Sequence, residues 1–270
     1  MKRKLEAYHQ HTWIISSEHF QSRLRQGEVE PLRGILEDMF DEIKIILYLR
    51  HPLETAISSW SMKSMKIRKG IVRLSLDKPE RFSGLCDHKT MIERWVNVFG
   101  SGRMCVRLFQ KNMFVKGDLI HDFCDAANIE TDQEMALPDR KNQALSYFAI
   151  KILSRVRSIL GSRFHELNSR HWDLLLQLCE QYFSGFPVYL PTVAEADAFD
   201  RYYCDSMRWV HQMFFPHRPL LWGEKFPVVR DENDSRFKAT WTSEEDSILT
   251  MFTDLWISTL ANDSVLQQRT

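Results

Sequence analysis

The chain lacks the features that mark several large classes of protein. No stretch approaches the roughly 18 uninterrupted apolar residues of a membrane-spanning helix, and residues 1–9 contain no apolar run like that of a signal peptide. The 36 Lys and Arg residues are balanced by 36 Asp and Glu residues, so no bulk field gathers nucleic acid or an anionic membrane. We therefore expect a cytoplasmic protein without a membrane span or a nucleic-acid partner, in which a local cluster holds any anionic ligand.

Signatures of disulfide, metal and hydrolase chemistry are also missing. The five cysteines are odd in number, widely spaced and without a Cys-x-x-Cys pair, which argues against a disulfide framework or a thiolate zinc site and predicts buried reduced thiols. The sequence contains neither His-Glu-x-x-His nor Gly-x-Ser-x-Gly. We therefore expect no metal and no serine-hydrolase centre.

Short β-like runs alternate with helical patterns in the first half of the chain. The runs cover residues 13–15, 43–49 and 104–109, and the second is almost continuously apolar, as in a strand buried on both faces. One helical pattern opens at Pro52, and another follows Asp87 and stops at Gly100. Strands separated by helices predict βαβ units and a mainly parallel sheet.

The second half of the chain is predicted to be mostly helical. Apolar residues keep helical spacing over residues 145–160, and Thr242-Ser243-Glu244-Glu245 has the form of a capping box. Residues 223–239 are rich in charge and turn formers and predict a long surface loop. We expect an α/β core over residues 1–138 and a mainly helical part of the same domain over residues 139–270.

The most informative pattern lies where the second strand ends. Arg50 closes the apolar run, Pro52 opens a helix, and Ser58 follows eight residues after the arginine. Open parallel sheets bind ligands at the carboxyl ends of their strands, and a guanidinium fork with one hydroxyl can hold a phosphate. The alternative is an arginine paired with a nearby carboxylate and a serine tolerated in a helix. The residues alone leave both interpretations open.

The pattern of Arg50, Pro52 and Ser58 after a hydrophobic strand resembles the 3′-phosphate-binding motif of sulfotransferases. Further stretches are similar, in order and spacing, to bacterial, carbohydrate-type members of that family. They are Ile14-Ile15-Ser16-Ser17-Glu18, residues 95–109, residues 117–123 and Arg140-Lys141-Asn142-Gln143-Ala144-Leu145-Ser146. The resemblance covers roughly residues 13–160.

The resemblance implies a fold, a co-substrate and a reaction. It implies a P-loop-type three-layer core with a parallel sheet, and transfer of a sulfuryl group from 3′-phosphoadenosine 5′-phosphosulfate to a hydroxyl or amine of a saccharide or glycoconjugate. Arg50 and Ser58 would bind the 3′-phosphate of the co-substrate, and Glu18 would be the catalytic base. Glu18 has an alternative role, as a carboxylate in the first turn of a helix capped by Ser16 or Ser17. His19 is a second, weaker candidate for the base.

The sequence departs from the family at the phosphosulfate loop. Members begin with a strand and a Lys-x-Gly-Thr-Thr loop, and only twelve residues precede Trp13 here. We expect a truncated reading frame, a piece of a split gene or a chain that has lost catalysis, with in-frame codons upstream of Met1 encoding the loop in the first case. The alternative function is a non-catalytic nucleotide-binding or protein-interaction module derived from a sulfotransferase.

Overall fold

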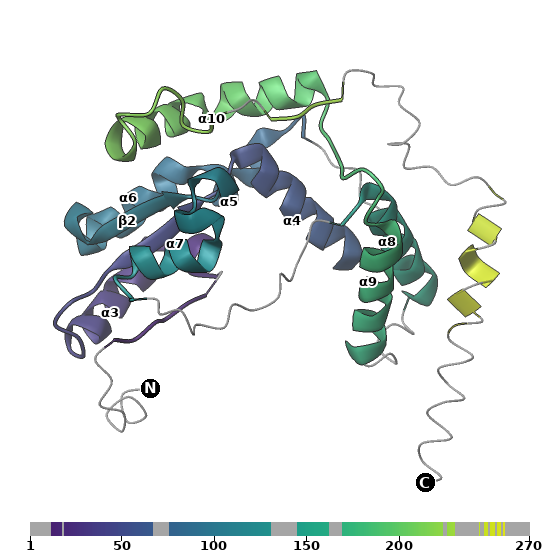
Figure 1. Cartoon of the computed structure of the whole chain (residues 1–270), viewed down its shortest axis with the longest axis horizontal. Helices are drawn as coiled ribbons and strands as arrows, with labels where there is room; N and C mark the ends of the chain where they lie inside the picture. The colour runs from purple at the N-terminus through teal and green to yellow at the C-terminus, as the bar shows by residue number, and fades with distance from the viewer. Residues whose placement is uncertain are drawn as a thin grey trace, which may run out of the picture. The chain divides into compact units, whose positions relative to one another are not determined.

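The structure is a computed structural model, and it describes residues 12–17, 19–66, 76–130, 145–161, 169–223, 226–229 and nine positions from 243 to 256. These residues form an α/β protein that is mostly helical and contains a small parallel sheet (Figure 1). The chain divides into two compact units. The first comprises Met1–Ala56, Asp77–Pro138 and Asp197–Phe226, and the second comprises Ile57–Leu76, Asp139–Ala196 and Pro227–Thr270.

The sheet consists of β1 (Ile45–Leu49) and β2 (Met104–Leu108). The strands are parallel, and Ile45 is opposite Met104 while Leu49 is opposite Leu108. Between them the chain forms α4 (Pro52–Lys66) and α6 (His88–Phe99). Two of the three predicted strands and both predicted helices are therefore confirmed.

The strand predicted at Trp13 is wrong. Residues 12–17 are irregular, and the Ile14 and Ile15 side chains are exposed. The Ser17 side chain accepts a hydrogen bond from the backbone N–H of His19, where α2 (His19–Ser22) begins. A run of three apolar residues is stable as a strand only if its backbone N–H and C=O groups form hydrogen bonds with a neighbouring strand. No described strand lies beside it to form them.

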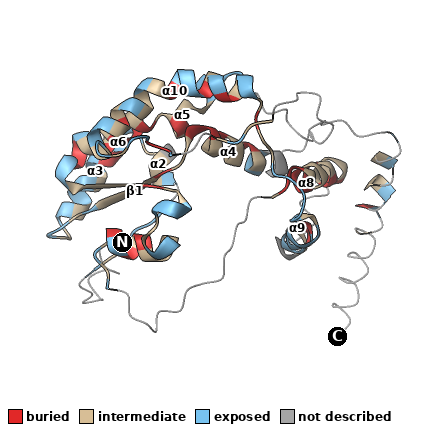
Figure 2. Ribbon diagram, turned by 45° about the horizontal axis from the view of Figure 1, so that its top comes forward, coloured by how far each residue is buried: buried red, intermediate tan, exposed pale blue. Residues whose placement is uncertain are grey.

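One face of the sheet is apolar and lies under three helices. These are α3 (Gln26–Glu37), α6 and α10 (Val193–Phe214), and their side chains pack with Leu49, Leu108 and Met104. Helix α10 contains several of the buried residues of the first unit (Figure 2), and one of them, Val210, packs with Leu49 and Leu108 of the sheet. Because α10 is far from the strands in sequence, the core of this unit is completed by a non-local contact.

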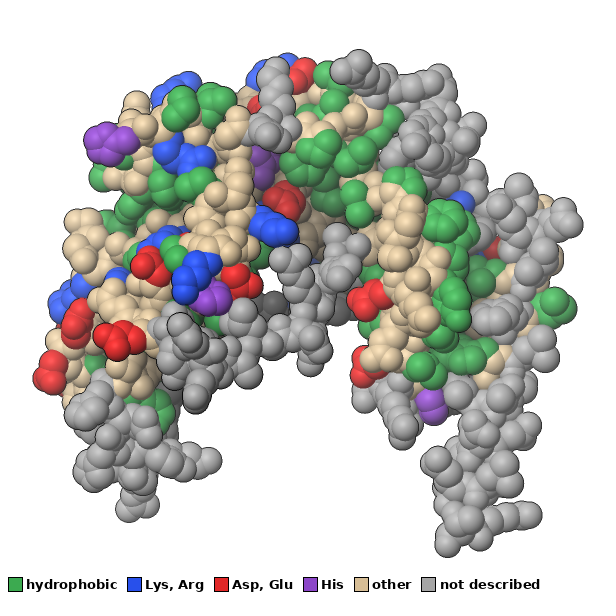
Figure 3. Space-filling model, viewed as in Figure 1, with side chains coloured by type: hydrophobic (Ala, Val, Ile, Leu, Met, Phe, Trp, Pro, Cys, Tyr) green, Lys and Arg blue, Asp and Glu red, His purple; other side chains and the backbone are tan. Residues whose placement is uncertain are grey.

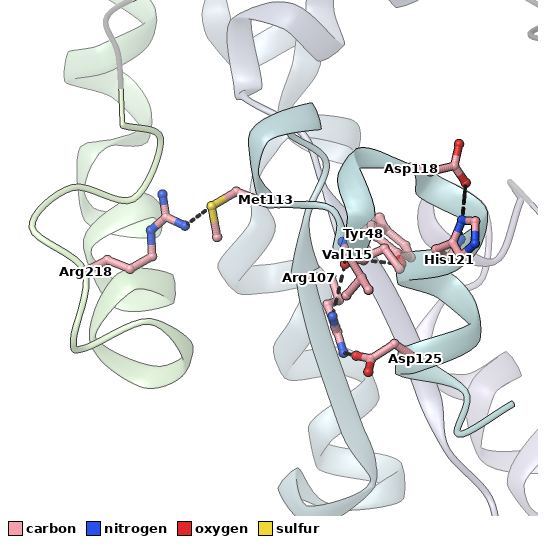
Figure 4. Close-up of polar contacts among 9 residues, drawn as sticks. Tyr48, Arg107, Met113, Val115, Asp118, His121, Asp125 and Arg218 are labelled. Carbon is pink, nitrogen blue, oxygen red and sulfur yellow. Dashed lines mark hydrogen bonds and ion pairs between the residues drawn. The ribbon is translucent and has the colours of Figure 1, made fainter. Parts of the chain in front are cut away.

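The opposite face of the sheet carries a polar network. Tyr48 and Arg107 are cross-strand neighbours (Figure 4), and both contact Asp122 of α7 (Leu119–Ala126). Helices therefore lie on both faces of the sheet. Burial and the hydrogen bond to Asp122 raise the pKa of Tyr48, so that its phenol remains a donor.

The second unit is built around α8 (Tyr147–Leu160) and α9 (Ser169–Phe183). Ser146 caps α8, because its Oγ accepts from the N–H of Ala149 at 3.1 Å. Apolar side chains gather over these two helices (Figure 3), and Leu174, Leu178 and Tyr182 form an exposed row along α9. The helix predicted at 145–160 is thus confirmed.

The remaining short elements connect the parts described above. They are η1 (Pro79–Phe82), α5 (Ser83–Cys86), η2 (Ser101–Arg103), η3 (Lys111–Met113) and η4 (Val115–Gly117). No described helix is both long and apolar enough to cross a membrane. Most of the predicted loop and of the predicted capping box lies outside the described residues.

Candidate functional site

The backbone at the carboxyl end of β1 is held from two neighbouring elements. The carbonyl oxygen of Leu49 accepts a hydrogen bond from the N–H of Phe109 at 2.6 Å, just beyond the end of β2. The carbonyl oxygen of Arg50 accepts from Nε2 of His88, the first residue of α6, at 2.8 Å. Since Pro52 then starts α4, these bonds fix the turn that aims the Arg50 side chain.

The Arg50 guanidinium has one aromatic and one acidic neighbour. Its Cζ lies 4.7 Å from the centroid of the Phe109 ring, and Nε lies 3.2 Å from Oε1 of Glu54. Nε is buried and donates no hydrogen bond, although 36% of the side chain is exposed. The exposed part therefore belongs to the rest of the side chain, at the edge of the sheet where an anion could approach.

Glu54 is a weakly stabilised anion. Burial raises its pKa above the usual value, and the attraction of Arg50 offsets only part of that rise. An ionised carboxylate at this position is therefore less stable than in water, even with a guanidinium beside it. The ion pair has neither an aligned Nε hydrogen bond nor full desolvation to strengthen it.

Two histidines lie next to the arginine, His88 fully buried and His51 mostly buried. Burial lowers the pKa of His51 to about 4, with a further contribution from His88, and burial likewise lowers the pKa of His88 to about 4. Both imidazoles are therefore neutral at pH 7. The His51 ring contacts Trp222 and Phe226 at centroid distances of 5.4 and 5.6 Å, and its Nε2 lies 4.0 Å from a carboxylate oxygen of Asp200.

The nearby thiol is not a nucleophile. Burial raises the pKa of Cys86 to about 12, and its Sγ donates a hydrogen bond to the carbonyl oxygen of Pro52 at 3.2 Å. A thiol that is protonated at neutral pH does not attack substrates. Cys86 therefore supports the start of α4 rather than a covalent step.

Three buried polar atoms without hydrogen-bond partners lie in residues at this end of the sheet. They are Nε of Arg50, Nδ1 of His88 and Oε1 of Gln110. The Gln110 amide orientation is fixed by its other end, because Nε2 donates to the carbonyl oxygen of Trp222 at 2.6 Å. Buried polar groups in native proteins are nearly always paired with protein or with water, and among the described residues of the first unit the unpaired buried side-chain atoms gather at this end of the sheet.

Of the three site residues predicted from the sequence, Arg50 lies at this end of the sheet. Ser58 is half-buried in α4 and belongs to the second unit, and Glu18 lies outside the described residues. The weaker candidate, His19, is exposed at the start of α2. The ion pair between Arg50 and Glu54 is the contact predicted by the alternative interpretation, in which Arg50 pairs with a nearby carboxylate and binds no ligand.

The sequence analysis did not identify three residues that contact Arg50: Glu54, His88 and Phe109. Only Glu54 left a local signal, since a carboxylate four residues after an arginine is placed to meet it once α4 begins. His88 lies in α6 and Phe109 follows β2. Both are far from Arg50 in the sequence, so no spacing of residues predicts their contacts with it.

The described residues contain no group of three His, Cys, Asp or Glu side chains that could hold a metal ion. No protein-family model, no curated protein and no solved structure matches the chain.

Proposed function

We propose that this chain is a sulfotransferase-like protein whose Arg50 binds the 3′-phosphate of 3′-phosphoadenosine 5′-phosphosulfate. In this proposal β1 and β2 are part of a P-loop-type three-layer core, and the acceptor is a hydroxyl or amine of a saccharide or glycoconjugate. The family assignment comes from the sequence resemblance. The observation that supports the role of Arg50 is its place just after the carboxyl end of a parallel strand, with a side chain that is 36% exposed.

The environment of Arg50 suits an oxyanion. The main chain at Arg50 is held by the hydrogen bonds from the Phe109 N–H to the Leu49 carbonyl and from the His88 side chain to the Arg50 carbonyl, so little ordering of the main chain remains to be done on binding. The Phe109 ring, 4.7 Å from Cζ of Arg50, adds a cation–π contact that helps to hold the guanidinium in place. The neighbouring imidazoles are neutral and hence add no charge that would obscure the role of Arg50.

The proposed reaction is an in-line transfer. The bond between sulfur and the bridging phosphate oxygen breaks as the acceptor oxygen or nitrogen bonds to sulfur, and adenosine 3′,5′-bisphosphate leaves. Arg50 and Ser58 would anchor the 3′-phosphate, and Glu18 would take the proton of the acceptor. The phosphosulfate group itself needs the Lys-x-Gly-Thr-Thr loop of the family.

The first test concerns the nucleotide. Adenosine 3′,5′-bisphosphate is expected to bind more tightly than adenosine 5′-monophosphate, and Arg50→Ala should weaken binding of the bisphosphate by about tenfold or more. The reason is that a hydrogen bond to a charged group is worth about 1.5 to 3 kcal/mol. Isothermal titration calorimetry measures both affinities.

Arg208→Ala is the matched control for the loss of one positive charge. Arg208 pairs with Asp205 on α10, and 62% of its side chain is exposed. This variant should bind adenosine 3′,5′-bisphosphate as the parent does. Equal affinities for the two nucleotides, or an Arg50→Ala variant that binds as well as the parent, would refute the proposed function.

A further inference from the structure

The partner of Arg50 in the ligand-free protein is a residue of the same turn. Glu54 lies in the first turn of α4, one helical turn after Arg50, and its Oε1 is 3.2 Å from the arginine Nε. The side chains are 36% and 42% exposed, so solvent and solutes reach both. An anion that approaches the guanidinium therefore meets a carboxylate that is already in contact with it.

Glu54 is a partner that can be replaced. Its pKa is raised by burial in spite of Arg50, which means that this site disfavours the charged carboxylate. The Arg50 Nε donates no hydrogen bond to it. A phosphate or sulfate oxygen that reaches the exposed part of the arginine side chain would form charge-assisted hydrogen bonds with the guanidinium, whereas Glu54 forms none through the buried Nε.

We propose that Glu54 competes with the oxyanion ligand for Arg50, so that binding requires the carboxylate to be displaced and Glu54 lowers the affinity of the site. This inference rests on the proposed function, since it presupposes that Arg50 holds an anion. Glu54 is in this respect a specificity-determining residue, because it excludes anions whose contacts with Arg50 are too weak to displace it. A carboxylate that simply stabilises the start of a helix would have no such effect on binding.

The competition predicts that replacing Glu54, a residue of the binding site, increases the affinity for the ligand. Glu54→Gln removes the charge and keeps the size of the side chain, and it should tighten binding of adenosine 3′,5′-bisphosphate by about 3- to 10-fold. This range corresponds to the loss of one partly exposed ion pair together with the repulsion between carboxylate and ligand. Glu54→Ala should tighten binding in the same direction, so the result does not depend on one replacement.

Glu93→Gln provides the matched control. Glu93 pairs with Lys89 on α6 with the same spacing of four residues, at 3.8 Å and with both side chains 43% exposed. It should leave the affinity unchanged. Titration calorimetry on the full chain measures all the variants at one salt concentration, and circular dichroism verifies that each is folded.

The outcomes separate this inference from the proposed function. If Arg50→Ala weakens binding but Glu54→Gln leaves it unchanged or weakens it, the competition does not exist while the anion site stands. Tightening of equal size in Glu93→Gln would show a general charge effect and would also overturn the inference. An Arg50→Ala variant that binds normally would instead remove the proposed function.

Discussion

The Asp122→Ala variant is expected to lose about 3 to 5 kcal/mol of unfolding free energy. Asp122 has a side chain that is only 2% exposed, and it accepts three hydrogen bonds. The donors are the Tyr48 hydroxyl at 2.6 Å, Nη1 of Arg107 at 3.1 Å and the N–H of Val115 at 3.0 Å. Removing the carboxylate leaves the part-buried Tyr48 hydroxyl and the N–H of Val115 without this acceptor, and it takes from Arg107 the more buried of its two carboxylate partners.

Asp125→Asn tests whether burial, rather than contact with Arg107, carries this stabilisation. Asp125 accepts from Nη2 of Arg107 at 2.6 Å, but its side chain is 54% exposed. Its replacement should cost at most about 1 kcal/mol. Urea denaturation followed by circular dichroism gives the stabilities, and hydrogen exchange at β1 and β2 localises the loss to the first unit. Equal losses in the two variants would contradict the expected role of Asp122.

The strands and helices around Arg50 could be predicted because their signals are local. An almost continuous apolar run gives β1, Pro52 marks the start of α4, and Gly100, with a φ of +85°, ends α6 where only glycine is relaxed. The same reasoning failed at Trp13. Three apolar residues are too few to distinguish a strand from an exposed segment.

The sequence contains a sign of the polar face of the sheet, namely one polar residue within each apolar strand. Tyr48 interrupts an otherwise aliphatic strand, and Arg107 does the same in β2. Two polar side chains on neighbouring strands call for a shared partner, but nothing in the sequence identifies Asp122 as that partner. The packing of α10 on the sheet was equally hidden. Thr192 and Glu195 form its capping box, which predicts where the helix begins and not what it covers.

Acid is expected to destabilise the first unit between pH 6.5 and pH 4, through His51 and His88. The pKa of each imidazole is about 4 in the folded chain, against about 6.5 when unfolded. Within that interval the unfolded state binds more protons, so the unfolding free energy falls as pH falls. The stabilisation is complete above pH 6.5, and its loss approaches about 3 kcal/mol for each imidazole at pH 4.

The contribution of His88 can be isolated because glutamine imitates its neutral form. Nε2 of His88 donates to the carbonyl oxygen of Arg50 while Nδ1 is buried without a partner, so a proton added at Nδ1 would be a desolvated charge. His88→Gln can keep the donor and cannot take up that proton. Urea midpoints measured from pH 7 to pH 5 should therefore fall less steeply in His88→Gln than in the parent.

The exposed His217 provides the comparison, because His217→Gln also removes one imidazole. Glu54 acts in the opposite direction, since its raised pKa makes the folded state gain stability as pH falls through that pKa. The Glu54→Gln variant should therefore show a steeper acid loss than the parent, and His88→Gln a shallower one. If the stability of His88→Gln depends on pH as that of the parent and of His217→Gln does, His88 is protonated in the folded chain at no cost. The environment of His88 at the end of β1 would then not be desolvated, and the hydrogen bond that holds the Arg50 carbonyl would not depend on a buried neutral imidazole.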